Sequence, residues 1–231
     1  MVPLKKVVLV DFDGVVLRNK RADIQVAKRA SIYTWRKLNN VKSFNQHLIS
    51  PKQAEDICYN LYKGYGHTLT GLKDIGIPNC NMVDYNKAVY DTLDYSKLRE
   101  TNNNFDDFRT LINYCHEHHH EIYFFSNAPY RWISNTLKDE PDIMYSIEDV
   151  RKILHVDEDD ESYLKPYHLV YDKLQSHFTK ENVVFIDDNI GNMKPVINNV
   201  AWTNILFCGT NKKINNKLYF IDDLASAVNI I

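Results

Sequence analysis

The sequence predicts an α/β protein with a three-layer, Rossmann-like core around a parallel sheet and a small helical insert. Apolar runs alternate with segments of helical spacing, which is typical of parallel strands joined by helical crossovers. Several of these runs end in polar residues, at the end of a strand where such sheets bind ligands. Roughly 110 residues separate the first two runs, far more than one crossover helix needs, so an inserted unit is expected.

The core strands are predicted from continuous apolar runs, which suit strands that are covered on both faces. The first run ends directly before Asp11. The expected strands are residues 6–10, 122–125, 183–186 and 202–207, and the expected core helices are about 104–119, 129–138, 166–178, 189–198 and 220–231. The alternation of these elements indicates one continuous α/β core.

The insert is predicted to be a helical cap. Apolar and small residues recur at helical spacing between Ile24 and Leu38, and Ser50 followed by Pro51 is a typical helix start. Further helices are expected at about 51–63, 67–75 and 81–92. The expected domains are a core of residues 1–18 and 104–231 and a cap of residues 19–103.

Composition narrows the class of protein. The 231 residues carry a net charge of −2, which gives no reason to expect nucleic acid or a membrane surface as partner. The apolar run near the N-terminus has only about four residues before Asp11, too few for a signal peptide or a membrane span. The four cysteines have no paired spacing, which favours reduced thiols and a cytoplasmic location.

Four short groups of polar residues indicate a functional site. They are Asp11–Phe12–Asp13–Gly14, Ser126–Asn127, Lys165–Pro166 and Asp187–Asp188. Each group alone can also be explained without a function, as a solvated turn, a helix N-cap or a surface lysine. Because Asp11, Ser126 and Asp187 each follow an apolar run, the carboxyl ends of neighbouring strands are expected to bring the groups together.

These residue types suit phosphoryl transfer through an aspartate. A phosphate monoester repels nucleophiles, so its cleavage needs positive charge and positioned donors. Asp11 is the candidate nucleophile, which would form an aspartyl-phosphate and divide hydrolysis into two steps. Gly14 allows the chain to turn and bring Asp13 back toward the site. There Asp13 would protonate the leaving alkoxide and then deprotonate the attacking water.

The remaining groups predict a Mg²⁺ site and a phosphate site. Mg²⁺ prefers oxygen ligands and bridges to substrate phosphate. The expected metal-binding residues are Asp11, Asp13 through its backbone carbonyl, Asp187 and Asp188. Ser126 and Asn127, with nearby backbone N–H groups, would bind phosphoryl oxygens. Lys165 would offset the clustered carboxylates and the transferring phosphoryl group.

The four groups resemble motifs I to IV of the haloacid-dehalogenase-like hydrolase superfamily, from Asp11 to Asn192. In that superfamily, an aspartate two residues after the nucleophile marks phosphatases and phosphomutases, so Asp13 argues against dehalogenation. The insert resembles the superfamily's helical cap, and the C-terminal FIDDLASAV resembles its closing helix. Gly14 and Asn192 are supporting residues of these motifs.

Parts of the cap and core are also similar to the pyrimidine 5′-nucleotidase-like group. They are residues 62–72, 94–98, 165–171 and 185–192. This resemblance implies hydrolysis of nucleoside 5′-monophosphates, with pyrimidines favoured, and makes Tyr65 and Thr68 candidate substrate contacts in the cap. Two departures are present: Gly14–Val15 stands where the group typically has Asp-Thr, and Ser126 where threonine is usual.

Other functions stay open at this point. The motif I glycine occurs in many sugar-phosphate members, so a sugar-phosphate phosphatase or phosphomutase is the alternative enzyme. A catalytically idle binding protein is the non-enzymatic alternative, although the intact Asp11, Asp13, Lys165 and Asp187 argue against it. Receiver domains of signalling proteins use similar groups in a different order and lack a large insert. The expected partner is a small phosphorylated substrate, and the expected state is a monomer or a homodimer.

Three further signals receive structural explanations. The run from Cys115 to His120 cannot direct all its side chains at one ion and is expected to be a polar helix end. The acidic residues 157–161 lack the pattern of a calcium loop and are expected to be a solvated loop. The cap aromatics are expected to form mostly the interior of a small helical unit.

Overall fold

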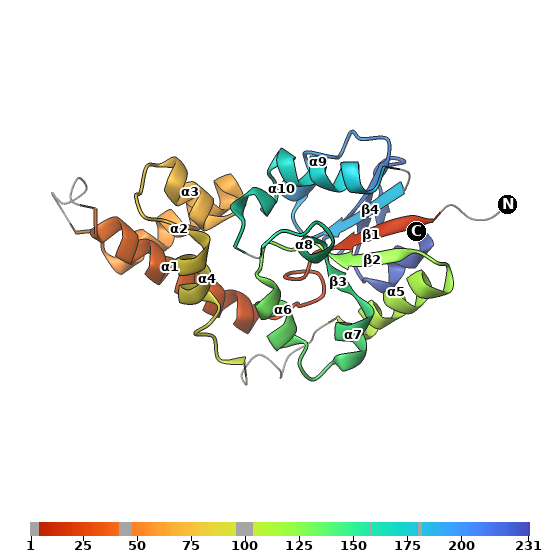
Figure 1. Cartoon of the computed structure of the whole chain (residues 1–231), viewed down its shortest axis with the longest axis horizontal. Helices are drawn as coiled ribbons and strands as arrows, with labels where there is room; N and C mark the ends of the chain where they lie inside the picture. Colours follow the sequence, from red (N-terminus) through yellow and green to blue (C-terminus); the bar gives the residue numbers. More distant parts are fainter. Residues whose placement is uncertain (1–4, 42–47, 96–103, 158, 180–181) are drawn as a thin grey trace. The chain divides into compact units, whose positions relative to one another are not determined.

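The computed structural model describes residues 5–41, 48–95, 104–157, 159–179 and 182–231. Within these residues, one seven-stranded sheet has the order β3-β2-β1-β4-β5-β7-β6. The strands are β1 (Lys6–Val10), β2 (Glu121–Phe124), β3 (Glu148–Asp149), β4 (Asn182–Asp187), β5 (Trp202–Phe207), β6 (Lys212–Lys213) and β7 (Leu218–Ile221). All neighbours are parallel except the edge pair of β6 and β7. The predicted α/β fold with a mostly parallel sheet is confirmed (Figure 1).

Helices cover both faces of this sheet. Successive side chains of a strand point to opposite faces. On β2, Tyr123 packs on Phe178 at the end of α9 (His168–His177), with 5.7 Å between ring centroids. The next residue, Phe124, packs on Phe108 of α5 (Phe105–Glu117) at 5.6 Å. The two helices therefore lie on opposite faces, which produces the three expected layers (Figure 1).

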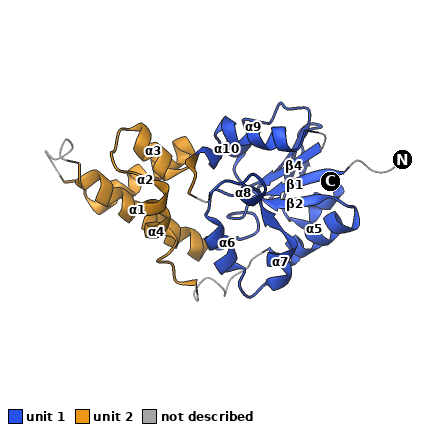
Figure 2. Ribbon diagram, in the orientation of Figure 1, with its two compact units in different colours: residues 1–19, 101–158, 162–231 blue, residues 20–100, 159–161 orange. Residues whose placement is uncertain are grey.

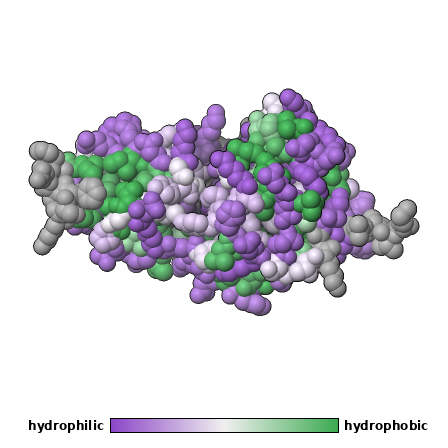
Figure 3. All heavy atoms as spheres, turned by 90° about the horizontal axis from the view of Figure 1, so that it is seen from above, coloured by the Kyte–Doolittle hydropathy of each residue, from purple (hydrophilic) through white to green (hydrophobic). Residues whose placement is uncertain are grey.

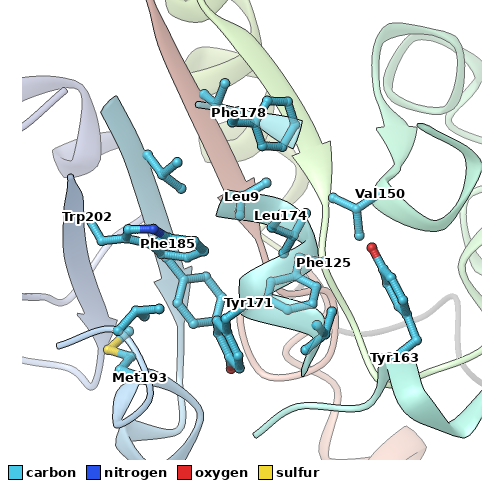
Figure 4. Packing of buried hydrophobic residues seen from close by; sticks show 14 of the residues in the cluster. Leu9, Phe125, Val150, Tyr163, Tyr171, Leu174, Phe178, Phe185, Met193 and Trp202 are labelled. Atoms are coloured by element: carbon cyan, nitrogen blue, oxygen red, sulfur yellow. The ribbon is translucent and has the colours of Figure 1, made fainter. Parts of the chain in front are cut away.

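Aromatic residues pack on one another within the core on the α9 side of the sheet. Figure 4 shows Phe125, Tyr171, Phe185 and Trp202 among the residues of this cluster. The Phe125 ring lies 5.6 Å from that of Tyr171 and 5.4 Å from that of Phe185, in edge-on and tilted arrangements that aromatic rings prefer. Because Phe125 directly precedes Ser126, this packing fixes the end of β2 where the candidate site begins.

The remaining core helices are shorter than the sequence suggests. They are α6 (Tyr130–Thr136), α7 (Pro141–Ser146), α8 (Val150–Ile153) and α10 (Ile190–Met193), with 3₁₀ turns at Glu161–Tyr163 and Ala225–Asn229. The expected helix at 220–231 was wrong: residues 218–221 form β7, which pairs with β5, and only the short 3₁₀ turn follows. The side chain of Asp223 accepts from the backbone N–H of Ser226 and thereby starts that turn.

The chain divides into two compact units (Figure 2). The first comprises Met1–Asn19, Thr101–Glu158 and Ser162–Ile231, and the second comprises Lys20–Glu100 and Asp159–Glu161. These bounds lie close to those expected for core and cap. The segment Asp159–Glu161 differs from the expected bounds, which assigned all of residues 104–231 to the core. Asn86 donates to Asp159 at 2.8 Å, and the ammonium of Lys73 lies 2.6 Å from a Glu161 carboxylate oxygen.

The second unit is helical. Its helices are α1 (Lys20–Asn39), α2 (Pro51–Tyr65), α3 (Thr68–Asp74) and α4 (Met82–Val89). Ser50 forms a capping box with Gln53 at the start of α2, as the Ser-Pro pair predicts. Gly66 ends α2 with φ of +74°, a left-handed conformation that favours glycine.

The surface carries mixed polarity. Hydrophilic residues cover much of the face seen in Figure 3, and hydrophobic residues occur there in separate groups. Across the described parts of the chain, we find no helix with the length and apolar character needed to cross a membrane.

Candidate active site

The loop after β1 is a tight turn that returns toward the sheet. The backbone N–H of Asp11 donates to Ile186 of β4 at 2.9 Å, so the nucleophile candidate lies at the strand end. Beyond it, the N–H of Gly14 donates to Leu17 and that of Leu17 donates to Phe12, both at 2.9 Å. Gly14 has φ of +84°, and a Cβ atom there would overlap the carboxylate of Asp188. The turn therefore requires glycine both for its backbone conformation and for its close approach to Asp188.

Lys165 lies between the two acidic groups. Its Nζ atom is 2.6 Å from Asp187 Oδ2 and 3.0 Å from Asp11 Oδ2. The Lys165 side chain is 1% exposed and that of Asp187 is completely buried. The rings of Phe125 and Phe185 lie 5.1 and 5.5 Å from the ammonium, within cation–π range. The structure thus brings Lys165 into contact with Asp11 and Asp187, as expected for groups at the ends of neighbouring strands.

Asp187 is held by a full set of donors. Its Oδ1 accepts from the backbone N–H of Asn189 at 2.8 Å, and Asn192 Nδ2 lies 3.1 and 3.0 Å from Oδ1 and Oδ2. The hydroxyl of Tyr171 donates to the backbone carbonyl of Asn192. Asn192, expected as a supporting residue, therefore fixes the orientation of Asp187.

The motif II residues join two loops of the site. Asn127 Nδ2 donates to the Lys165 carbonyl at 2.9 Å, and its Oδ1 accepts from the Lys165 N–H at 2.7 Å. The Asn127 amide thus holds the lysine loop in place. The hydroxyl of Ser126 accepts from the Ala128 N–H at 3.3 Å, and its own O–H remains chemically able to donate to an oxygen.

The electrostatics of the cluster favour a cation. Burial raises the pKa of Asp11 well above its usual value; nearby Lys165 opposes this rise, and Asp187, Asp188 and Asp13 reinforce it. Burial lowers the pKa of Lys165, but Asp11 and Asp187 outweigh that effect and the net direction is upward. The lysine therefore stays protonated, and the surrounding carboxylates still repel one another.

Oxygen ligands for a divalent ion are close together. Among the described residues, Asp11, Asp187 and Asp188 form the group whose ligand atoms all lie within 4.8 Å of one another. Carboxylate oxygens are the ligands that Mg²⁺ prefers. Because Asp187 already accepts from Lys165, Asn189 and Asn192, the more exposed Asp188 is the better placed of the pair to hold an ion with Asp11.

Two structural contacts of the site were not foreseen from sequence. The indole Nε1 of Trp132 donates to Asp13 Oδ1 at 2.9 Å. Arg151 donates to the Ala128 carbonyl at 2.7 Å and forms a buried ion pair with Asp149. No sequence signal marks these residues, because Trp132 lies in a short segment of mixed polarity and Arg151 lies outside the four polar groups.

The two cap candidates lie within the second unit. The hydroxyl of Tyr65 donates to Asp74 at 2.5 Å. Thr68 is 2% exposed, and its hydroxyl lies 3.6 Å from the Cys58 sulfur. Contact of these residues with a substrate stays a prediction, and the burial of Thr68 makes Tyr65 the better candidate.

No protein-family model and no curated protein matches this sequence. Solved structures do match its fold. A candidate HAD-hydrolase, YfnB from Bacillus subtilis, bound to magnesium, is 14% identical with a TM-score of 0.52, over 98% of each chain. A candidate β-phosphoglucomutase from Thermotoga maritima is 12% identical with a TM-score of 0.52, over 97% of each chain.

A third match is a candidate haloacid dehalogenase-like hydrolase from Burkholderia xenovorans LB400. It is 12% identical, with a TM-score of 0.51, over 99% of this chain and 100% of that one. At these identities the comparison shows the fold. The chain therefore has the fold of haloacid-dehalogenase-like hydrolases over nearly its whole length.

Proposed function

We propose that this protein is a Mg²⁺-dependent phosphatase that acts through an aspartyl-phosphate. The observation that carries the proposal is the buried Lys165 ammonium between Asp11 and Asp187. The Asp188 carboxylate lies beside Gly14, in the turn that follows Asp11. This arrangement supplies a nucleophile, a fixed cation and oxygen ligands at one end of the sheet. The shared fold supports a hydrolase of this class.

The residues divide the reaction into two displacements. Asp11 attacks the phosphorus, the ester P–O bond breaks, and the leaving alkoxide takes a proton from the Asp13 carboxyl. The Asp13 carboxylate then takes a proton from water, which attacks the phosphorus and releases Asp11 and inorganic phosphate. Lys165 and Ser126 compensate the charge on the phosphoryl oxygens.

The residues present fit a divalent metal ion. Asp11 and Asp188 would hold Mg²⁺, together with the Asp13 carbonyl, and Asp187 would contribute mainly through its fixed charge. The bound ion would neutralise the phosphoryl oxygens and lower the repulsion between the ester and the carboxylates.

The substrates that we propose are nucleoside 5′-monophosphates, with pyrimidines favoured. Support comes from the similarity of cap residues 62–72 and of the lysine and second acidic motifs to the pyrimidine 5′-nucleotidase-like group. Phosphate release should be measured with Mg²⁺ across UMP, CMP, AMP, GMP, their deoxy forms and hexose phosphates. Preference for pyrimidine monophosphates supports the nucleotidase, whereas activity confined to sugar phosphates keeps the chemistry and rejects this substrate class.

A phosphomutase is the second candidate, because glycine follows Asp13 and the fold also matches a candidate β-phosphoglucomutase. A mutase returns the phosphoryl group to a sugar and releases little inorganic phosphate. Incubation of hexose phosphates with a catalytic amount of the bisphosphate distinguishes the two: positional transfer without phosphate release would overturn the phosphatase. The Asp11→Asn variant, purified in the same way, is the control for a contaminating phosphatase.

A further inference from the structure

The acid–base candidate is held by a tryptophan. Trp132 is completely buried, and its indole N–H donates to Asp13 Oδ1 at 2.9 Å. Trp132 lies in α6, whose first turn starts at Pro129, two residues after Asn127. Both residues belong to the first unit, so the contact is internal to the α/β core.

The position of Trp132 is fixed from its own side. Its backbone N–H donates to the Pro129 carbonyl at 2.9 Å. Directly before Pro129, the Ala128 carbonyl accepts from buried Arg151, which is paired with Asp149 at 2.7 Å. The indole therefore projects from a helix start that is anchored to a buried ion pair, and it is a fixed partner for Asp13 in the turn after β1.

We propose that Trp132 is a positioning residue for Asp13, an inference that rests on the proposed phosphatase function. An indole N–H donates a hydrogen bond but accepts none, and it does not lose its proton at the pH values at which proteins are folded. It can therefore hold the Asp13 carboxyl in one orientation without taking part in the proton transfer. A fixed orientation matters because proton transfer to a leaving group falls steeply when the donor is misplaced.

The test is the dependence of the rate on the leaving group. Trp132→Phe keeps a buried aromatic ring and removes the donor. We expect kcat/KM, which reports formation of the aspartyl-phosphate, to fall about 10- to 100-fold with an alkyl monophosphate such as UMP, which needs an acid, and less than about threefold with p-nitrophenyl phosphate. Because Asp13 also serves as the base in the second step, kcat alone would not separate the two substrates. Asp13→Asn should show the same pattern with larger losses.

Trp202 supplies a matched control. It is also completely buried in the core, and its indole Nε1 donates to Gln175 Oε1 at 2.6 Å. Trp202→Phe removes an equivalent indole hydrogen bond that does not involve Asp13. The ratio of kcat/KM for UMP to kcat/KM for p-nitrophenyl phosphate should therefore stay at the wild-type value. Equal loss on both substrates in Trp132→Phe, as in an ordinary core substitution, would overturn the proposal.

A second readout does not need turnover. The chain has three tryptophans, so three indole N–H signals are expected by NMR and can be assigned with the Phe variants. Asp13→Ala removes the acceptor and should shift the Trp132 signal while leaving that of Trp202 in place. An unmoved Trp132 signal overturns the contact itself. If the wild-type protein is inactive, both the phosphatase function and the positioning role are overturned. If the wild type is active but Trp132→Phe has the wild-type ratio of activities on the two substrates, only the role of Trp132 is rejected.

Discussion

The Lys165 ammonium lies 2.6 Å from Asp187 Oδ2, and both side chains are shielded from solvent. A buried ion pair is costly to form, because both charges lose their hydration. Here the cost is reduced by Asn192 and the Asn189 N–H, which donate to the same carboxylate, and by the carboxylate of Asp11 on the ammonium. The pair therefore links the stability of the core to the arrangement of the site.

Removal of Lys165 should destabilise the protein strongly. Lys165→Met leaves Asp187 and Asp11 as uncompensated buried carboxylates, so the free energy of unfolding should fall by about 3–5 kcal/mol in the presence of a metal chelator. Urea titration measures this change. Asp187→Asn added to Lys165→Met should restore part of the loss.

The exposed pair of Lys152 and Glu148 is the control for this series. Because solvent screens that pair, Lys152→Met should leave the stability nearly unchanged. A similar effect of both lysine substitutions would contradict the special position of Lys165.

Substitution of Gly14 should damage metal binding more than stability. Gly14→Ala places a side chain at φ of +84° and against the Asp188 carboxylate, which must move. We expect Mg²⁺ affinity to fall about 10- to 100-fold, as it does when the orientation of a ligand is disturbed. Isothermal titration calorimetry measures the affinity.

Gly209 separates strain from displacement. It has φ of +77°, and nothing lies within 4 Å of an added Cβ atom. Gly209→Ala should therefore carry a comparable backbone cost of about 1–2 kcal/mol and leave Mg²⁺ affinity unchanged. Equal metal affinities in the two variants would show that Asp188 does not depend on the glycine.

Replacement of Asp11 should separate activity from stability. Burial raises the pKa of Asp11, so its charged form is unfavourable in the folded state without a cation. Asp11→Asn should therefore keep the melting temperature or raise it, while kcat falls by at least about 10⁴-fold because the nucleophile is lost. Residual turnover close to the wild-type rate would reject Asp11 as the nucleophile.

The main features of the site follow from strand order and strand ends. In the structure Val10 pairs with Ile186, so Asp11 and Asp187, the next residues, emerge side by side from neighbouring strands. The apolar runs locate these ends, and the parallel sheet brings them to one edge. This part of the site could be predicted because it depends on local pattern and on a general rule of topology.

Other contacts depend on packing that no local pattern records. The strands β3 and β6 have two residues each, too few to show a period, and they exist through their partners β2 and β7. The hydrogen bonds between Asn127 and Lys165 join residues 38 positions apart in sequence. The hydrogen bond between Trp132 and Asp13 joins residues 119 positions apart. Such contacts are determined by the tertiary structure, so sequence reasoning identified Asn127 and Asp13 without their partners.

Buried His67 should make the stability of the second unit depend on pH. Burial lowers the pKa of His67 to about 4, and its Nδ1 accepts from the Leu69 N–H at the start of α3. Since the unfolded chain binds a proton below about pH 6.5, stability is full above that pH and falls as the pH approaches 4. Between pH 7.5 and 5 the loss in the free energy of unfolding due to His67 should be about 2 kcal/mol.

His67→Asn keeps a cap acceptor and should remove this part of the pH dependence in urea titrations. His118→Asn, at an exposed position, should leave this part of the pH dependence in place. An unchanged difference between the two pH values in His67→Asn would show that another group is responsible.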